Sequence, residues 1–368
     1  MTLLVALIVI VAIALAFANG ANDNSKGVAT LIGSGLVKLK PAIIYAAVTT
    51  ALGSLAAIWI GAELAAKFKG KGIVGDAIWQ SAEFPACVGL AAGITVLLAT
   101  RLSMPISTTH AMVGSIIGIG VSGGGLHWHA VWKSFFYPLL AAPLIAVVLA
   151  GLVYLIFSGL RRLARIQRET CLCVGQEVVP VSIGQDGVMA MASTDITLTA
   201  AQREECVERY RGRFLGIDAQ SLLDKSHLLT AGAVSFARGL NDTPKIAALM
   251  IGLTLVTDAS AVVIVGVAMA VGGLLAVRRV AKTMSYHITG MNDGQAFTAN
   301  LCTAFLVIVA SKWGVPVSTT HVSCGSLIGI GAVNRQGRWK MIGTILMAWV
   351  ITLPVAALLG AAAWQMIG

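Results

Sequence analysis

The chain has 368 residues, of which 57% are hydrophobic and 11% are charged, and its formal net charge is +10. Soluble proteins carry about 25% charged residues because a surface that faces water needs them, so this composition excludes a soluble globular protein and makes the lipid bilayer the solvent. Basic residues cluster at the ends of apolar stretches, as at Lys67, Lys69 and Lys71, which is typical of topology signals and not of a nucleic-acid surface.

Apolar stretches long enough to cross a bilayer recur along the chain, because about 20 helical residues span the hydrocarbon core. They fall at 2–18, 41–61, 82–100, 130–158, 228–253, 256–277, 294–311 and 340–366. Between the fourth and fifth stretch, acidic and basic side chains mix, and we expect a cytoplasmic linker with some helix around 200–213. The predicted organisation is a first membrane repeat at 1–159, the linker at 160–226 and a second membrane repeat at 227–368.

The two halves repeat two polar motifs in the same order. Phe17-Ala-Asn-Gly-Ala-Asn-Asp-Asn-Ser-Lys26 matches Phe236-Ala-Arg-Gly-Leu-Asn-Asp-Thr-Pro-Lys245, and Pro105-Ile-Ser-Thr-Thr-His110 matches Pro316-Val-Ser-Thr-Thr-His321. Duplicated membrane halves often fold as inverted repeats that hold the substrate near the bilayer midplane. We therefore predict an all-α polytopic membrane protein of two inverted repeats, whose broken or re-entrant helices meet at a midplane site.

The first motif places carboxylates inside apolar stretches. A charge in the membrane core costs about 2.5–3.5 kcal/mol or more, so such a group must face a cavity or a partner. Neighbouring glycine and proline residues free backbone groups that can line that cavity. We expect ion binding at Asn22, Asp23, Asn241 and Asp242, with helix capping as the alternative.

The second motif predicts the start of a half-helix in each repeat. Proline suits the first turn of a helix, and serine and threonine suit its cap. The free backbone N–H groups and hydroxyls of such a start form an anion site at the positive end of the helix dipole. Packing of these small side chains between helices is the alternative.

With both motifs doubled around a central linker, the chain resembles the inorganic phosphate transporter family of cation-coupled permeases. The resemblance covers nearly the whole chain outside the linker. It implies a phosphate site formed by Ser107, Thr108, Thr109, Ser318, Thr319 and Thr320. It implies coupling-cation sites formed by Asn22, Asp23, Asn241 and Asp242, with the two aspartates as metal ligands if the ion is sodium. Two further residues, Gln295 and Asn300, resemble family positions close to the site.

One departure from the family pattern is the lysine at Lys26 and Lys245, where a second asparagine is usual. A buried ammonium there would take the place of sodium, contact phosphate or carry a proton; alternatively, each lysine extends to water or pairs with its aspartate. The coupling ion, sodium or proton, therefore stays open. His110 and His321 are candidate proton carriers, although we expect each to donate to a backbone carbonyl.

The predicted function is secondary active transport of inorganic phosphate across the cell (inner) membrane by alternating access, driven by a sodium or proton gradient. A permease for sulfate or another tetrahedral oxyanion is the first alternative; phosphate is favoured because it usually keeps a proton at neutral pH, for which Asp23 and Asp242 are hydrogen-bond acceptors. A membrane enzyme and a passive anion channel are weaker alternatives. The expected partners are phosphate, a coupling cation and membrane lipid, without nucleic acid or any cofactor beyond the coupling ion, and a homodimer stays open.

Overall fold

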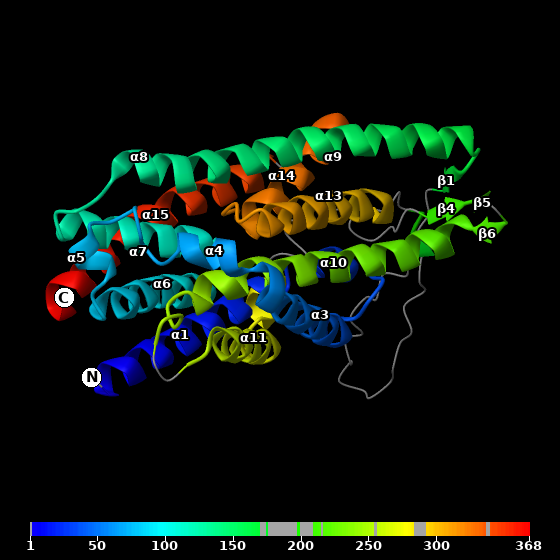
Figure 1. The fold of residues 1–368 in the computed structure, drawn as a ribbon. Helices are drawn as coiled ribbons and strands as arrows, with labels where there is room; N and C mark the ends of the chain where they lie inside the picture. The colour runs from blue at the N-terminus through cyan, green and yellow to red at the C-terminus, as the bar shows by residue number, and fades with distance from the viewer. Residues whose placement is uncertain are drawn as a thin grey trace, which may run out of the picture. The chain divides into compact units, whose positions relative to one another are not determined.

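The computed structural model describes residues 2–169, 174–175, 197–198, 209–214, 216–253, 256–282, 292–335 and 339–368. The chain divides into two compact units, Met1–Gly159 with Leu223–Gly368, and Leu160–Leu222. The larger unit is helical and contains both repeated motifs (Figure 1). The smaller unit lies within the stretch predicted as a linker.

The first half of the chain forms helices that are separated by short turns (Figure 1). Their bounds are α1 Thr2–Asp23, α2 Ala29–Gly33, α3 Leu39–Ile60, α4 Ala62–Lys67, α5 Asp76–Trp79, α6 Glu83–Arg101, α7 Thr108–Ser122, α8 Trp128–Val131, the π-helical turn η1 Trp132–Phe136 and α9 Tyr137–Leu163. The helices of the second half are α10 Ala219–Ala247, α11 Asp258–Leu275, α12 Arg278–Lys282, α13 Asp293–Lys312, α14 Thr319–Val333 and α15 Trp339–Ile367.

Within the described residues, seven helices are long and apolar enough to cross a membrane. They cover Leu3–Asp23, Leu39–Ile60, Glu83–Arg101, Trp128–Leu163, Asp258–Leu275, Asp293–Lys312 and Leu346–Ile367. In contrast, α7 and α14 have 15 residues each. At about 1.5 Å per residue they reach roughly 22 Å, which is less than the ~30 Å of the hydrocarbon core, so both are half-helices as the second motif predicts.

Helix α10 begins and ends earlier than the predicted stretch at 228–253. Its first turn is capped by Asp218, whose Oδ2 accepts a hydrogen bond from the backbone N–H of Ser221 at 2.9 Å. The last residues of the predicted linker, from Ala219 on, are therefore helical. The helix ends at Ala247 and is followed by turns up to Gly252, which has a φ of 105° that favours glycine.

Helices of the two repeats exchange packing partners. In α1, Gly20 lies against the carbonyl oxygen of Met269 in α11, and at the equivalent place Gly239 of α10 lies against the carbonyl oxygen of Thr50 in α3. A side chain at either glycine would collide with the neighbouring backbone, so the missing Cβ allows the helices to approach closely. Each repeat therefore completes its core with helices of the other.

The half-helices follow the same rule. In α7, Gly118 lies against the carbonyl oxygen of Ala357 in α15, while Gly329 of α14 lies against the carbonyl oxygen of Val147 in α9. The largest apolar cluster likewise combines buried residues from both halves of the chain. Each half-helix thus packs against a long helix of the opposite repeat, α7 against α15 and α14 against α9.

The smaller unit contains three antiparallel strand pairs among its described residues. These are β1 Gln167–Glu169 with β4 Arg209–Arg211, β2 Val174–Gly175 with β3 Thr197–Leu198, and β5 Arg213–Phe214 with β6 Ile217–Asp218. The helix expected around 200–213 is wrong where the structure describes it, since 209–211 is a strand; residues 199–208 lie outside the described residues. Successive side chains of a strand point to opposite faces, and Tyr210 points toward Arg161. The guanidinium carbon of Arg161 lies 5.9 Å from the centre of the Tyr210 ring.

Candidate functional site

The starts of the two half-helices lie next to each other. Ser107 caps α7 by accepting a hydrogen bond from the backbone N–H of His110 at 3.2 Å, and Ser318 caps α14 in the same way from His321 at 3.3 Å. The ring centres of these two histidines are 4.2 Å apart. Two segments far apart in the sequence therefore bring the positive ends of their helix dipoles together.

Hydroxyl groups cross from each half-helix to the other. The Oγ1 of Thr109 donates to the carbonyl oxygen of Val317 at 3.3 Å, and the Oγ1 of Thr320 donates to the carbonyl oxygen of Ile106 at 3.1 Å. Each acceptor is the residue just before the opposite cap. Contacts of residue i with j′ and of j with i′ are the pattern that a two-fold axis produces.

The two aspartates of the first motif share one amide. Asp23 ends α1 and Asp242 lies near the end of α10, and both are buried. The Nδ2 of Asn19 is 3.2 Å from an oxygen of each carboxylate and 2.9 Å from the Oγ1 of Thr108. The carboxylates and the half-helix start thus belong to one polar cluster.

Lys26 does not extend to water. Its side chain is buried, and its Nζ lies 2.5 Å from the Oδ1 of Asp23 and 2.7 Å from the carbonyl oxygen of Ile106. It also donates to the Oγ1 of Thr320 in the other repeat. The lysine therefore pairs with its own aspartate and reaches across to the opposite half-helix.

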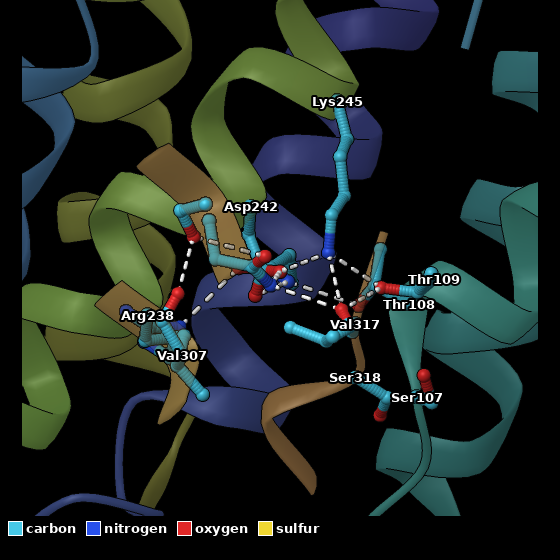
Figure 2. Close-up of polar contacts among 12 residues, drawn as sticks. Ser107, Thr108, Thr109, Arg238, Asp242, Lys245, Val307, Val317 and Ser318 are labelled. Carbon is cyan, nitrogen blue, oxygen red and sulfur yellow. Dashed lines mark hydrogen bonds and ion pairs between the residues drawn. The ribbon is translucent and has the colours of Figure 1, made fainter. Parts of the chain in front are cut away.

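Lys245 repeats this arrangement from the other side. Its Nζ is 3.3 Å from the Oδ1 of Asp242, 2.8 Å from the carbonyl oxygen of Val317 and 2.8 Å from the Oγ1 of Thr109. Figure 2 shows the side chain extended from α10 into this set of oxygens. The alternative of a lysine extending to water is wrong for both positions, because the oxygens that satisfy each ammonium lie inside the protein.

The two motif asparagines hold the chain that leads into each half-helix. Asn22 donates to the carbonyl oxygen of Met104 at 3.0 Å and accepts from the backbone N–H of Ile106 at 3.1 Å. Asn241 donates to the carbonyl oxygen of Val317 at 3.2 Å and accepts from the Oγ of Ser311 at 3.3 Å. In this conformation both amides fix the approach to the helix caps.

A buried arginine is the main residue that the sequence reasoning missed. Arg238 donates to the Oδ1 of Asn19 at 3.2 Å, to the Oδ1 of Asn24 at 3.3 Å and to the Oγ1 of Thr50 at 3.0 Å, and its Nε has no partner among the described residues. The signal was present, because Arg238 stands where the first repeat has Asn19 in two motifs that otherwise match closely. We call the eight connected residues of this site the central polar cluster: Asn19, Asp23, Lys26, Thr109, Arg238, Asp242, Lys245 and Thr320.

The remaining predicted residues lie at different places. Thr319 is buried at the position equivalent to Thr108. The expected hydrogen bond to a backbone carbonyl is wrong for His321, because neither of its ring nitrogens has a partner among the described residues; in His110 this holds for Nδ1. The two histidine rings pack against each other, and His321 also packs on Trp349.

The two further candidates, Gln295 and Asn300, both lie in α13. Gln295 forms a capping box with Asn292 at the start of α13. Asn300 donates to the Oγ1 of Thr30 at 2.9 Å, and this hydroxyl is also 3.0 Å from the Nε2 of the buried His227. Asn300 therefore connects α13 to α2 and α10 through Thr30, whereas the capping box of Gln295 fixes the start of α13 itself.

Comparisons with known proteins agree with this geometry. A model of the phosphate transporter family matches residues 19–360. A putative phosphate permease of Pyrococcus abyssi is 27% identical over 396 residues, covering 96% of each chain, and a probable low-affinity inorganic phosphate transporter of Mycobacterium tuberculosis is 27% identical over 367 residues, covering 97% of this chain and 76% of the relative.

A solved structure described as the sodium-dependent phosphate transporter shares the fold. Its TM-score is 0.74 at 20% sequence identity, and the match covers 100% of this chain and 99% of the other. The family match extends over both repeats and the membrane-length helices on either side of the smaller unit. The chain is thus a multi-pass membrane protein that belongs to the phosphate transporter family.

Proposed function

We propose that the chain is a secondary active transporter that carries inorganic phosphate across the cell membrane by alternating access, driven by a sodium or proton gradient. The observation that carries the proposal is the meeting of two half-helix starts, one from each repeat, inside a buried cluster of hydrogen-bond donors. Family membership and the names of the relatives support phosphate as the substrate.

The donors suit a tetrahedral oxyanion. Backbone N–H groups at a helix start, hydroxyls and ammonium groups all donate, and an anion oxygen accepts from each of them. The proposed phosphate contacts are Ser107, Thr108, Thr109, Ser318, Thr319 and Thr320. Lys26 and Lys245 lie within hydrogen-bond distance of the threonine hydroxyls and add positive charge to the same place.

The cross-bonds suggest how binding is coupled to movement. Thr109 and Thr320 each donate to a backbone carbonyl of the opposite repeat. A phosphate oxygen would be a stronger, charged acceptor for the same hydroxyls. Binding would then release the contacts that join the two half-helix starts, which is the change that alternating access requires at a site shared by two repeats.

The choice between phosphate and sulfate follows from the carboxylates. Asp23 and Asp242 can accept a hydrogen bond from the hydroxyl group that phosphate keeps near neutral pH, whereas sulfate offers no such donor and would be repelled by any carboxylate that its lysine leaves unshielded. We therefore propose that phosphate is preferred. Sulfate competition is the direct measure of this preference.

The test is uptake of labelled phosphate into liposomes that contain the purified protein, under separate sodium and proton gradients. The double substitution Thr109→Val with Thr320→Val should lower apparent phosphate affinity by more than about 100-fold, because each hydrogen bond to a charged group contributes about 1.5–3 kcal/mol and two such bonds are lost. Thr49→Val is the matched control, since Thr49 bonds only within its own helix, to the carbonyl oxygens of Tyr45 and Ala46.

Two results would contradict the proposal. Unchanged affinity in the double variant would remove the half-helix starts from the site. Uptake that is not accelerated by unlabelled phosphate on the opposite side would indicate a channel and not a carrier.

A further inference from the structure

We propose that Lys26, Lys245 and Arg238 are tethered counter-charges that take the place of coupling sodium ions, so that this chain binds and moves its anion without sodium. The inference rests on the proposed function, because it concerns the same central polar cluster. It concerns the choice between sodium and proton as the coupling ion, which the proposed function leaves open, and it argues against sodium.

The first argument is the saturation of both ammonium groups. A lysine ammonium has three N–H donors, and Lys26 has three acceptors: a carboxylate oxygen of Asp23, the carbonyl oxygen of Ile106 and the hydroxyl of Thr320. One carboxylate, one carbonyl and one hydroxyl oxygen are also the kinds of ligand that a hard metal cation needs. The ammonium thus occupies the oxygens that a sodium ion would use.

The second argument is that the other repeat builds the same set. Lys245 has a carboxylate oxygen of Asp242, the carbonyl oxygen of Val317 and the hydroxyl of Thr109 within 2.8–3.3 Å of its Nζ. These acceptors are the repeat equivalents of those of Lys26, in the same arrangement. Both candidate cation positions of the first motif are therefore filled by groups of the chain itself.

The third argument is the charge balance. The central polar cluster contains two carboxylates, those of Asp23 and Asp242. It contains three cationic groups, those of Lys26, Lys245 and Arg238. Both lysines are paired with a carboxylate, while the hydrogen-bond partners of Arg238 among the described residues are neutral side chains. The ionised cluster has one positive charge in excess, and a buried excess charge is costly until a counter-ion arrives. A singly charged anion balances it with no further cation.

Arg238 is also the asymmetric member of the set. The first repeat has the neutral Asn19 at the equivalent position, and the two residues bond to each other at 3.2 Å. Its Nε is buried and has no partner among the described residues. The guanidinium therefore retains a donor for a negative ligand after the structural hydrogen bonds are made.

The experiment measures sodium dependence in two independent ways, with the full chain. Labelled phosphate uptake into liposomes is compared in sodium and in choline buffers, and the thermal midpoint of purified protein is compared in the same buffers without phosphate. For the wild type we expect equal uptake and an unchanged midpoint. A ligand that binds only the folded state raises the thermal midpoint of unfolding. Sodium binding would therefore be detected by this measurement even if the protein transported nothing.

The diagnostic variant is Lys26→Asn, which leaves Asp23 without a tethered cation. In choline buffer its uptake should fall about 100-fold, because a buried carboxylate that loses its partner is strongly unfavourable, and sodium should restore uptake and raise the midpoint. Lys26→Arg keeps the charge and should remain independent of sodium. Lys40→Asn, at an exposed position of α3, is the control with the same chemical change.

The outcomes separate the inference from the proposed function. Wild-type uptake that needs sodium, or a wild-type midpoint raised by sodium, overturns the tethered counter-charges while leaving phosphate transport intact. Absence of phosphate uptake under every gradient overturns the proposed function, and the midpoint still decides whether the chain binds sodium. If Lys26→Asn does not fold, the wild-type and Lys26→Arg measurements decide the question.

Discussion

At the scale of single residues, the two ion pairs of the central polar cluster differ in length. The Nζ–Oδ1 distance is 2.5 Å between Lys26 and Asp23 and 3.3 Å between Lys245 and Asp242. Loss of either carboxylate leaves a buried ammonium without its counter-charge, which costs about 3–5 kcal/mol. The shorter pair should be the more sensitive one, because the Coulomb energy rises as the distance falls.

Replacement of the aspartates tests this order. We expect Asp23→Asn to reduce gradient-driven phosphate uptake about 100-fold and Asp242→Asn to reduce it less. The reason is that breaking a buried ion pair costs more free energy when the two charged atoms are closer together. Uptake into liposomes and the thermal midpoint measure both effects. The exposed Asp76, changed to Asn, is the control.

A charge-neutral double variant distinguishes structure from transport. Replacing a whole buried pair by uncharged residues is often neutral for stability, so Asp23→Asn with Lys26→Met should recover the thermal midpoint of the wild type. Uptake should stay low, because Lys26 then no longer places a positive charge beside the hydroxyl of Thr320. Full recovery of uptake by the double variant would remove this pair from the transport mechanism.

The sequence allowed some of these residues to be predicted and hid others. Asp23 and Lys26 stood out because charges in an apolar stretch need partners. Arg238 was visible only as a mismatch to Asn19, and its burial depends on Asn24 and Thr50, which lie far from it in the sequence. Contacts of that kind are set by tertiary packing and leave no local pattern.

At the scale of helices, local chemistry predicted where the half-helices begin but not what they pack on. The start of α7 follows from the cap at Ser107, which acts within one turn, while Pro105 lies two residues before the cap and outside the helix. Its packing partner, α15, belongs to the opposite repeat, and nothing in the local sequence of α7 identifies that partner. The early start of α10 was missed because its first turns are polar.

A pair of glycine substitutions tests the exchanged packing. Gly118→Ala places a Cβ against the backbone carbonyl of Ala357, which cannot move aside as a side chain can, so we expect a loss of about 1–3 kcal/mol. Gly159→Ala enters open space in α9 and should stabilise the helix by up to about 1 kcal/mol. Thermal midpoints of the purified variants should therefore move in opposite directions; equal shifts would argue against the close approach of α7 and α15.

At the scale of the whole molecule, equivalent residues of the two repeats contact each other at several places. His110 packs on His321, and Asn19 bonds to Arg238. Because the contacts between Thr109 and Val317 and between Thr320 and Ile106 are reciprocal as well, the two repeats are related as the halves of an isologous dimer are. An inverted arrangement adds one further requirement, that this axis lies in the plane of the membrane.

The far ends of the half-helices test that requirement. If α7 and α14 start together at the midplane and are inverted, their last turns must point to opposite sides of the membrane. Val121 and Ala332 are exposed, equivalent positions in those turns. In a background without the six native cysteines, Val121→Cys and Ala332→Cys should react with a membrane-impermeant maleimide from opposite faces of sealed vesicles. Labelling of both cysteines from the same face would show that the two repeats are parallel. Two parallel repeats could not exchange equivalent conformations, and the site between the helix starts could then not open to each side of the membrane in turn by that exchange.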